Sequence, residues 1–268
     1  MNALRHQLLM IQAMAPLLTL GAMLSVSHAG LAENRWPDER AAGVFHCHAD
    51  FDLQHFEHLW GEMAQLQKDL HRQLRIPPME EPIHLFLFED RDTYHDYLEL
   101  HFPSVPYRRA LYIKQRGPGM VFAHRNPEFE DDVRHESTHA LLHAALPVVP
   151  LWLDEGLAEY FEAPASERAF GSPHLSRVRR AAWFGQMPKL EKLETLGELT
   201  EMGPAEYRNS WAWVHFMLHG PAEAHDELLT YLENIRSLSP PGLLSARLRR
   251  RMPDLNSRFL AHFRNWKE

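Results

Sequence analysis

The stretch His135-Glu136-Ser137-Thr138-His139 says the most about this chain. Two histidines four positions apart lie on the same face of a helix, where both imidazoles reach one metal ion. Glu136 stands beside them, and a carboxylate in this place accepts a proton during hydrolysis. The stretch therefore predicts a zinc site with His135 and His139 as ligands and Glu136 as general base.

The residues before the motif indicate the helix that this site needs. The pattern alone is short, and a chain with 19 histidines in 268 residues shows it by chance about one time in eight. Asn126-Pro127-Glu128, followed by three acidic residues, is typical of a helix start, and Pro147 cannot continue a helix. We expect a helix from near Asn126 to before Pro147, with both histidines in its middle.

A third protein ligand completes such a site, and two residues compete for it. Glu155 comes sixteen positions after His139. A helix that returns antiparallel from Pro150 carries Glu155 back to the level of the histidines. His143 continues the four-residue spacing but lies a further turn along the helix, roughly 5 to 6 Å away, and points past the metal. Glu155 is therefore the predicted third ligand, with His143 as the alternative.

The segment around Glu155 carries a family resemblance. Leu151-Trp152-Leu153-Asp154-Glu155-Gly156-Leu157-Ala158-Glu159-Tyr160-Phe161-Glu162 resembles the W-L-N-E-G-F-A-x-Y-F-E stretch of the aminopeptidase N-like gluzincins, and resembles still more closely the secreted peptidase MA-like domains. The likeness is tight over roughly residues 129 to 162. It implies a zincin-like fold, one Zn²⁺ per chain held by His135, His139 and Glu155, and Glu136 as base. The gap between the motifs is shorter than in the aminopeptidases, and residues 117–124 lack their amine-binding glutamate motif.

The start of the chain predicts export. Arg5 precedes an apolar run from Leu8 to Val26, and the small residues at 27–29 suit a cleavage site. We expect residues 1–29 to be a signal peptide, with cleavage after Ala32 or an uncleaved anchor as alternatives. With Cys47 as the only cysteine no internal disulfide forms, which suits a bacterial periplasm better than a heavily disulfide-bonded extracellular module. We expect a periplasmic or secreted protein with no stable membrane insertion after cleavage of the signal.

The net charge of the chain helps to predict the class of molecule that it binds. The formal net charge is −8, which argues against a general nucleic-acid binder. The last 25 residues are nevertheless basic, and we interpret them as the solvated face of a terminal helix rather than as a contact to an anionic surface. The expected partner is a peptide or protein substrate.

The order of elements predicts an α+β fold of the zincin-like kind. Residues 30–268 form one peptidase domain in this interpretation, with an upper lobe at 30–146 and a helical lower lobe at 147–268. The upper lobe holds a small mixed sheet with helices, followed by the central zinc helix, and the lower lobe is all helical with breaks at Gly and Pro pairs. The expected strands are 44–49, 83–88, 110–113 and 120–124, and the expected helices before the zinc helix are 53–74 and 91–101.

Three further roles are predicted around the metal. Met120 to His124 is the expected edge strand on which an extended peptide lies. Tyr207 is the candidate donor to the oxyanion, with His215 on the same helical face as the alternative and a structural aromatic stripe as the plain interpretation. Glu159 is either the carboxylate that accepts the second ring proton of a ligand histidine or a solvated helix residue.

These features together predict a zinc-dependent metallopeptidase in which Glu136 activates a water bound to the metal. The alternative is a zincin-fold protein that no longer cleaves and acts as a binding or assembly module of the cell envelope. His46-Cys47-His48 is interpreted as part of a half-buried strand, because its two histidines share one face and two ligands make a poor metal site.

Overall fold

The computed structural model describes residues 36–114 and 117–267. The predicted signal peptide at 1–29 and its alternative cleavage site after Ala32 lie outside these residues. Within the described part of the chain, no helix is long and apolar enough to cross a membrane.

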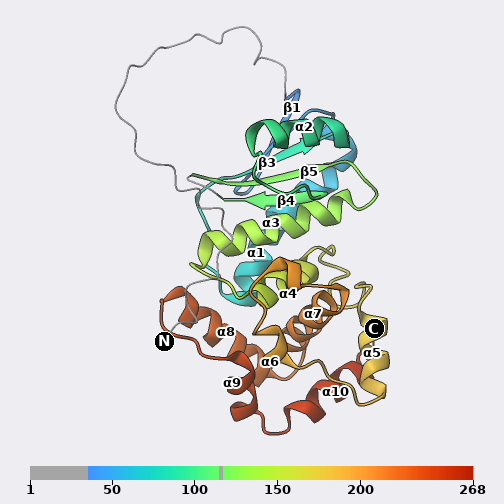
Figure 1. Cartoon of the computed structure of the whole chain (residues 1–268), viewed down its shortest axis with the longest axis vertical. Helices are drawn as coiled ribbons and strands as arrows, with labels where there is room; N and C mark the ends of the chain where they lie inside the picture. The colour runs from blue at the N-terminus through green and yellow to red at the C-terminus, as the bar shows by residue number, and fades with distance from the viewer. Residues whose placement is uncertain (1–35, 115–116, 268) are drawn as a thin grey trace.

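The chain has an α+β architecture that begins with a five-stranded mixed sheet (Figure 1). The spatial order is β1-β2-β3-β5-β4, in which β2, β3 and β5 are parallel and the two outer strands are antiparallel to their neighbours. The strands are β1 (Asp38–Ala42), β2 (Phe45–Ala49), β3 (Ile83–Phe88), β4 (Ala110–Ile113) and β5 (Gly119–His124). Four of the five were predicted. β1 was missed because Asp-Glu-Arg-Ala-Ala has no apolar alternation, and it pairs with β2 across a turn at Gly43, whose φ is +62°.

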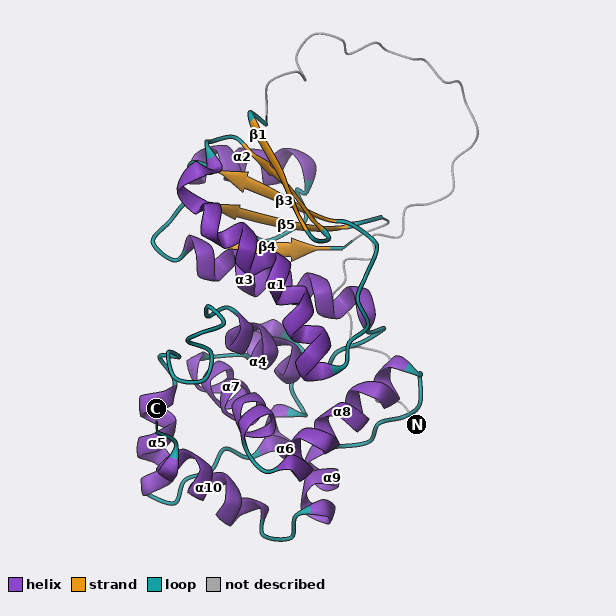
Figure 2. Cartoon of the chain, turned by 180° about the vertical axis from the view of Figure 1, so that it is seen from behind, coloured by secondary structure: helices purple, strands orange, loops and turns teal. Residues whose placement is uncertain are grey.

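Helices cover both faces of the sheet (Figure 2). Alternate strand residues such as Cys47, Leu85 and Val121 pack into the main core, on the face where α3 (Phe129–Ala145) and α1 (Glu57–Leu74, preceded by the 3₁₀ turn Leu53–Phe56) lie. On the opposite face, Phe88 and Phe122 pack against α2 (Arg91–His101). We call residues 36–145 the sheet half.

The edge of the sheet is not where the sequence placed it. β5 pairs with β3 on one side and β4 on the other, so the prediction that Met120 to His124 forms the edge is wrong. The sheet ends in β1 on one side and in β4 on the other, and the edge strand that packs on α3 is β4, which is antiparallel to β5. Both strands belong to one hairpin, and their local sequences do not reveal which of them pairs with the distant β3.

The chain from residue 151 to 267, which we call the helical half, contains helices alone among its described elements. The predicted breaks at Gly and Pro pairs fall between these helices. They are α4 (Leu151–Phe161), α5 (Leu175–Trp183), α6 (Leu190–Leu193), α7 (Pro204–His219), α8 (Ala222–Arg236), α9 (Leu244–Arg251) and α10 (Leu255–Asn265), with a 3₁₀ turn at Leu199–Glu201.

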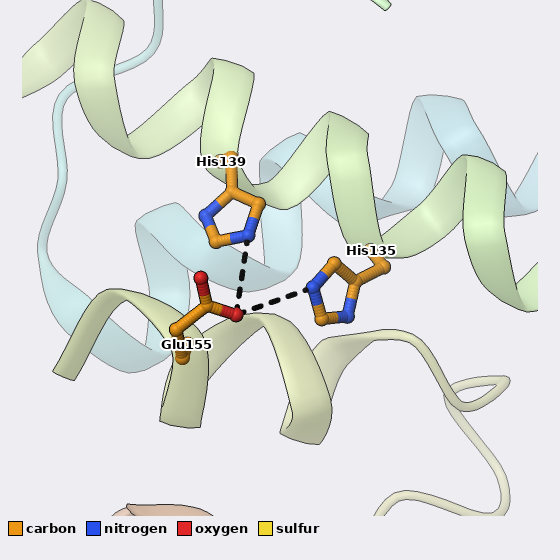
Figure 3. Close-up of side chains that lie close together, drawn as sticks. All are labelled: His135, His139 and Glu155. Carbon is orange, nitrogen blue, oxygen red and sulfur yellow. Dashed lines mark ion pairs between the residues drawn. The ribbon is translucent and has the colours of Figure 1, made fainter. Parts of the chain in front are cut away.

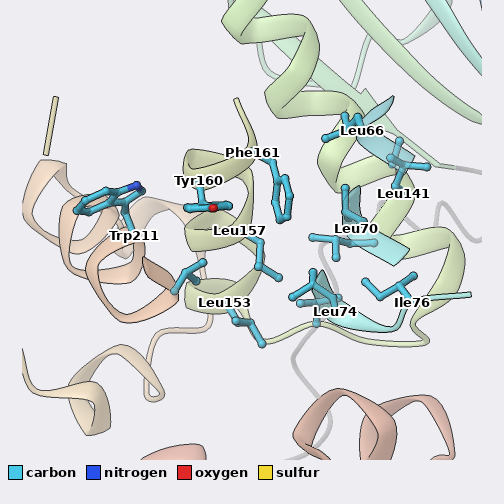
Figure 4. Close-up of a cluster of buried hydrophobic side chains, with 14 of the residues drawn as sticks. Leu66, Leu70, Leu74, Ile76, Leu141, Leu153, Leu157, Tyr160, Phe161 and Trp211 are labelled. Carbon is cyan, nitrogen blue, oxygen red and sulfur yellow. The ribbon is translucent and has the colours of Figure 1, made fainter. Parts of the chain in front are cut away.

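One apolar core joins the two halves, and α4 lies at its centre (Figure 4). Leu157 and Phe161 of α4 are fully buried in the same cluster as Leu70 of α1 and Leu141 of α3. On its other side α4 packs closely on α7, where a Cβ added at Gly156 would come within 2.8 Å of the backbone of Ser210. This close approach sets the height at which α4 presents Glu155.

Candidate metal centre

Three side chains from two helices converge between the halves (Figure 3). His135 and His139 project from one face of α3, and Glu155 rises from α4 to meet them. Glu155 Oε2 lies 3.6 Å from His135 Nε2 and 3.8 Å from His139 Nε2, and the three ligand atoms lie within 4.8 Å of one another. The structure thus brings together the three residues that the sequence predicted as ligands.

The spacing and chemistry of this group fit a zinc ion. Tetrahedral ligands at bond lengths of 2.0 to 2.2 Å stand about 3.3 to 3.6 Å apart, close to the two distances found here. Two imidazoles and a carboxylate are also a donor set that zinc accepts. The carboxylates around the group stabilise a positive charge at this place. Burial lowers the pKa of His139, but Asp154 and Glu155 outweigh burial and raise that pKa to about 9.

The ring nitrogens that face away from the centre each meet a carboxylate. Glu162 Oε2 lies 2.8 Å from His135 Nδ1, and Asp154 Oδ1 lies 3.0 Å from His139 Nδ1. Such outer contacts hold an imidazole in one tautomer and orientation, so that its other nitrogen is free to bind a metal. Arg134, buried on α3, donates from Nε to the backbone oxygen of Glu162 and thereby holds the end of α4 near His135.

These outer partners correct the sequence interpretation of Glu159. Its carboxylate contacts His174 Nε2 at 2.8 Å, so it serves neither a ligand histidine nor the solvent alone. Asp154 and Glu162 take the role instead. Glu162 follows Glu155 by two helical turns and lies on the same face of α4, a signal present in the sequence but not used.

His143, the alternative third ligand, lies outside the centre. Its Nε2 contacts Asp154 Oδ2 at 2.8 Å, and its ring stacks on Tyr112 of the edge strand β4 with 5.8 Å between centroids. His139, His143 and Asp154 form a second group with ligand atoms within 4.8 Å. Asp154 lies between the two histidines, with a hydrogen bond to His143 and an ion-pair contact of 3.0 Å to His139, so His143 reaches the centre through Asp154 rather than beside Glu155.

Glu136 follows His135 on α3 and is partly buried. Burial raises the pKa of its carboxyl, which the nearby histidines partly oppose. A raised pKa makes the carboxylate a better proton acceptor, which a general base requires.

Tyr207 faces the same region from α7. It is half-buried and lies one turn before Ser210, the residue that touches Gly156 of α4. Burial raises the pKa of its hydroxyl to about 12, and the charge of Glu155 adds to the effect. The hydroxyl therefore stays protonated at neutral pH and is available as a hydrogen-bond donor.

His215 does not serve as the alternative donor. It is fully buried, and its Nε2 and Nδ1 lie 3.0 Å from the backbone oxygen of Ala169 and from His262 Nε2. Both nitrogens are engaged inside the helical half. The predicted aromatic stripe, which includes Trp211, is part of the core there.

The chain is similar to solved structures, but not to any protein family or curated protein that was compared with it. Among solved structures, the chain is similar to an M1 zinc metallopeptidase from Deinococcus radiodurans, with 15% identity and a TM-score of 0.42 over 85% of this chain and 51% of that one. A point mutant of the same enzyme gives 14% identity and a TM-score of 0.41, covering 87% and 52% of the two chains. The chain spans about half the length of these structures.

Proposed function

We propose that this protein is a zinc-dependent metallopeptidase of the gluzincin type. The observation that carries the proposal is the meeting of His135, His139 and Glu155 with Glu136 beside them. Each ligand histidine has its outer nitrogen beside a carboxylate, as metal-bound imidazoles usually do.

The residues that would hold the metal are His135, His139 and Glu155. A zinc ion bound there supplies Lewis acidity, which lowers the pKa of a water molecule to near neutrality and polarises a carbonyl group. The remaining chemistry belongs to the side chains around it.

Glu136 accepts the proton of the attacking water and then delivers it to the leaving amine. Tyr207 donates a hydrogen bond to the carbonyl oxygen as negative charge develops there, a contribution that is typically worth about 3 kcal/mol. The edge strand β4, which lies next to α3, offers backbone groups to an extended peptide and aligns the scissile bond.

Export belongs to the same proposal. Removal of residues 1–29 would release the peptidase into the periplasm or the medium, and the mass of the protein recovered from those fractions tests this directly. A product that begins near Gly30 or Glu33 is expected, and a full-length product confined to membranes contradicts it.

The decisive experiment measures cleavage of an unfolded protein such as labelled casein. The wild type should carry close to one zinc per chain and lose activity to a chelator. Glu136→Gln should keep the metal and lose activity by about 10²- to 10⁴-fold. Glu130→Gln is the matched control on the same helix, because Glu130 contacts His58 and Arg134 instead of the centre. A Glu136→Gln protein with full activity would overturn the proposal.

A further inference from the structure

The outer face of α5 carries a pair of exposed aromatic side chains. Trp183 and the adjacent Phe184 are 66% and 76% exposed, while Leu175, Val178 and Ala182 on the inner face are buried. Figures 1 and 2 place α5 at the margin of the helical half, beside α10. The two residues are adjacent, and exposed apolar patches with a polar rim mark interaction sites.

Positive charge surrounds this pair. Residues 168–190 contain four arginines and one lysine and no acidic residue, although the whole chain has a net charge of −8. Arg177 and Arg180 are exposed, and with Phe184 they follow helical spacing on the outer face. Neither arginine has an acidic partner within the described residues. We call Arg177, Arg180, Trp183 and Phe184 the α5 face.

The packing of α10 extends this charge distribution. α10 packs against α5 and, like α5, contains no acidic residue. Its Arg264 donates from Nε to the backbone oxygen of Ala182 at 2.8 Å, which places a third guanidinium beside Trp183. The cationic groups therefore flank the aromatic pair from two helices, and no acidic side chain of either helix neutralises them.

We propose that the α5 face docks on the surface of a bilayer that contains anionic lipids. Tryptophan and phenylalanine partition into the headgroup region, and arginine binds lipid phosphate through paired hydrogen bonds. The exposed aromatic rings match the apolar part of the bilayer interface. The unpaired arginines match its anionic headgroups. The contact is peripheral, and it would keep the peptidase near substrates at the membrane.

The readout must be local, because the apolar run from Leu8 to Val26 binds vesicles by itself when it is present. Trp183 provides such a readout, since the other six tryptophans are buried or partly buried. Full-length protein is mixed with vesicles of phosphatidylcholine, with or without about a third of phosphatidylglycerol, whose acyl chains carry bromine as a quencher. The wild type should show quenching on the anionic vesicles, and Trp183→Phe should lose most of it.

The charge requirement is tested separately. Each lipid-facing arginine should contribute about fivefold to binding, so Arg177→Gln with Arg180→Gln should lower the anionic-vesicle affinity measured from Trp183 quenching about 25-fold. Leu238→Ser and Arg250→Gln are matched controls, because both residues are exposed at other places on the helical half and should leave the quenching unchanged. Melting temperatures verify that all variants are folded.

Two outcomes overturn the inference. In one, the fluorescence of Trp183 is not quenched by anionic vesicles, which would point instead to an acidic protein as the partner of this face. In the other, anionic vesicles quench the fluorescence of Trp183 equally in the arginine variants and in the controls.

Discussion

Two pairs of histidines with the same helical spacing have opposite surroundings. His135 and His139 on α3 are four positions apart, and so are His215 and His219 on α7. The first pair meets Glu155, Glu162 and Asp154. The second pair meets uncharged groups, namely the Ala169 carbonyl, the Tyr160 hydroxyl and His262.

The pKa values separate accordingly. Carboxylates outweigh burial at the first pair and raise the pKa of His139 to about 9. Burial dominates at the second and lowers the pKa of His215 to about 3, while that of His262 falls to about 4. Spacing on a helix therefore does not make a metal site. The carboxylates that a second helix brings to the imidazoles distinguish the candidate ligand pair from the pair that fills the core.

Removing the carboxylate between the ligands is the strongest test of this difference. Glu155→Ala should lower zinc affinity well beyond the 10- to 100-fold that is typical of outer contacts, because a direct ligand is lost. His143→Ala should retain stoichiometric zinc, since His143 reaches the centre only through Asp154. Metal analysis of the purified proteins measures both. Equal zinc loss in the two variants would contradict the assignment of the third ligand.

Acid should destabilise the core around the second pair, where His262 contacts His215. His215 and His262 stay neutral in the folded protein, while in the unfolded chain they bind protons below a pKa of about 6.5. Stability is therefore unaffected by them above pH 6.5 and falls as the pH drops from there toward 4, by up to about 1.4 kcal/mol per pH unit for each histidine.

The measurement is urea unfolding at several pH values in the presence of a chelator. His215→Asn, which does not titrate, should show a shallower loss of stability than the wild type between pH 6.5 and 4. Parallel pH profiles for the two proteins would mean that His215 is protonated in the folded state.

The close contact of α4 with α7 links the two pairs, and it is sensitive to a single methyl group. Gly156→Ala places a Cβ within 2.8 Å of the Ser210 backbone and should reduce the free energy of unfolding by about 1 to 3 kcal/mol. Gly61→Ala is the control, because nothing lies within 4 Å of a Cβ there and alanine favours the helix by about 1 kcal/mol. If both variants are stabilised, the helices are not as close as the structure has them.

The smallest effect concerns the outer contact of His135. Glu162→Gln should weaken zinc binding by about 10- to 100-fold without abolishing it. Glu159→Gln makes the same chemical change on the same helix, but its carboxylate contacts His174, so zinc affinity should not change. A competition assay with a coloured chelator compares the two. A larger loss in Glu159→Gln would favour the first of its two sequence interpretations, that it accepts the ring proton of a ligand histidine.

The sequence predicted the parts of the molecule that depend on neighbouring residues. The helices around His135 and Glu155 were predictable because capping residues, prolines and four-residue spacing act within a few turns. The two strands β4 and β5 were predicted for the same reason. The edge position in the sheet was assigned to β5 instead of β4. Which of the two strands lies at the edge depends on the pairing of β5 with β3, whose paired residues are 36 positions apart in the sequence.

The side-chain partners show the same limit. Glu159 and Glu162 are three residues apart on α4, and both are near a histidine. Glu159 contacts His174 because the loop after α4 brings His174 back to it. No local sequence pattern indicates this contact.

The sequence by itself determined that one helix presents two imidazoles on one face with a carboxylate next to the first of them, because the helical repeat is a property of the backbone. It also determined that a glutamate returns to their level after a short turn. The tertiary structure alone decided which carboxylates hold the outer ring nitrogens, which strand forms the edge, and that His215 lies in the core. These outcomes depend on distances of a few ångströms between separate elements. The packing of the whole chain sets those distances.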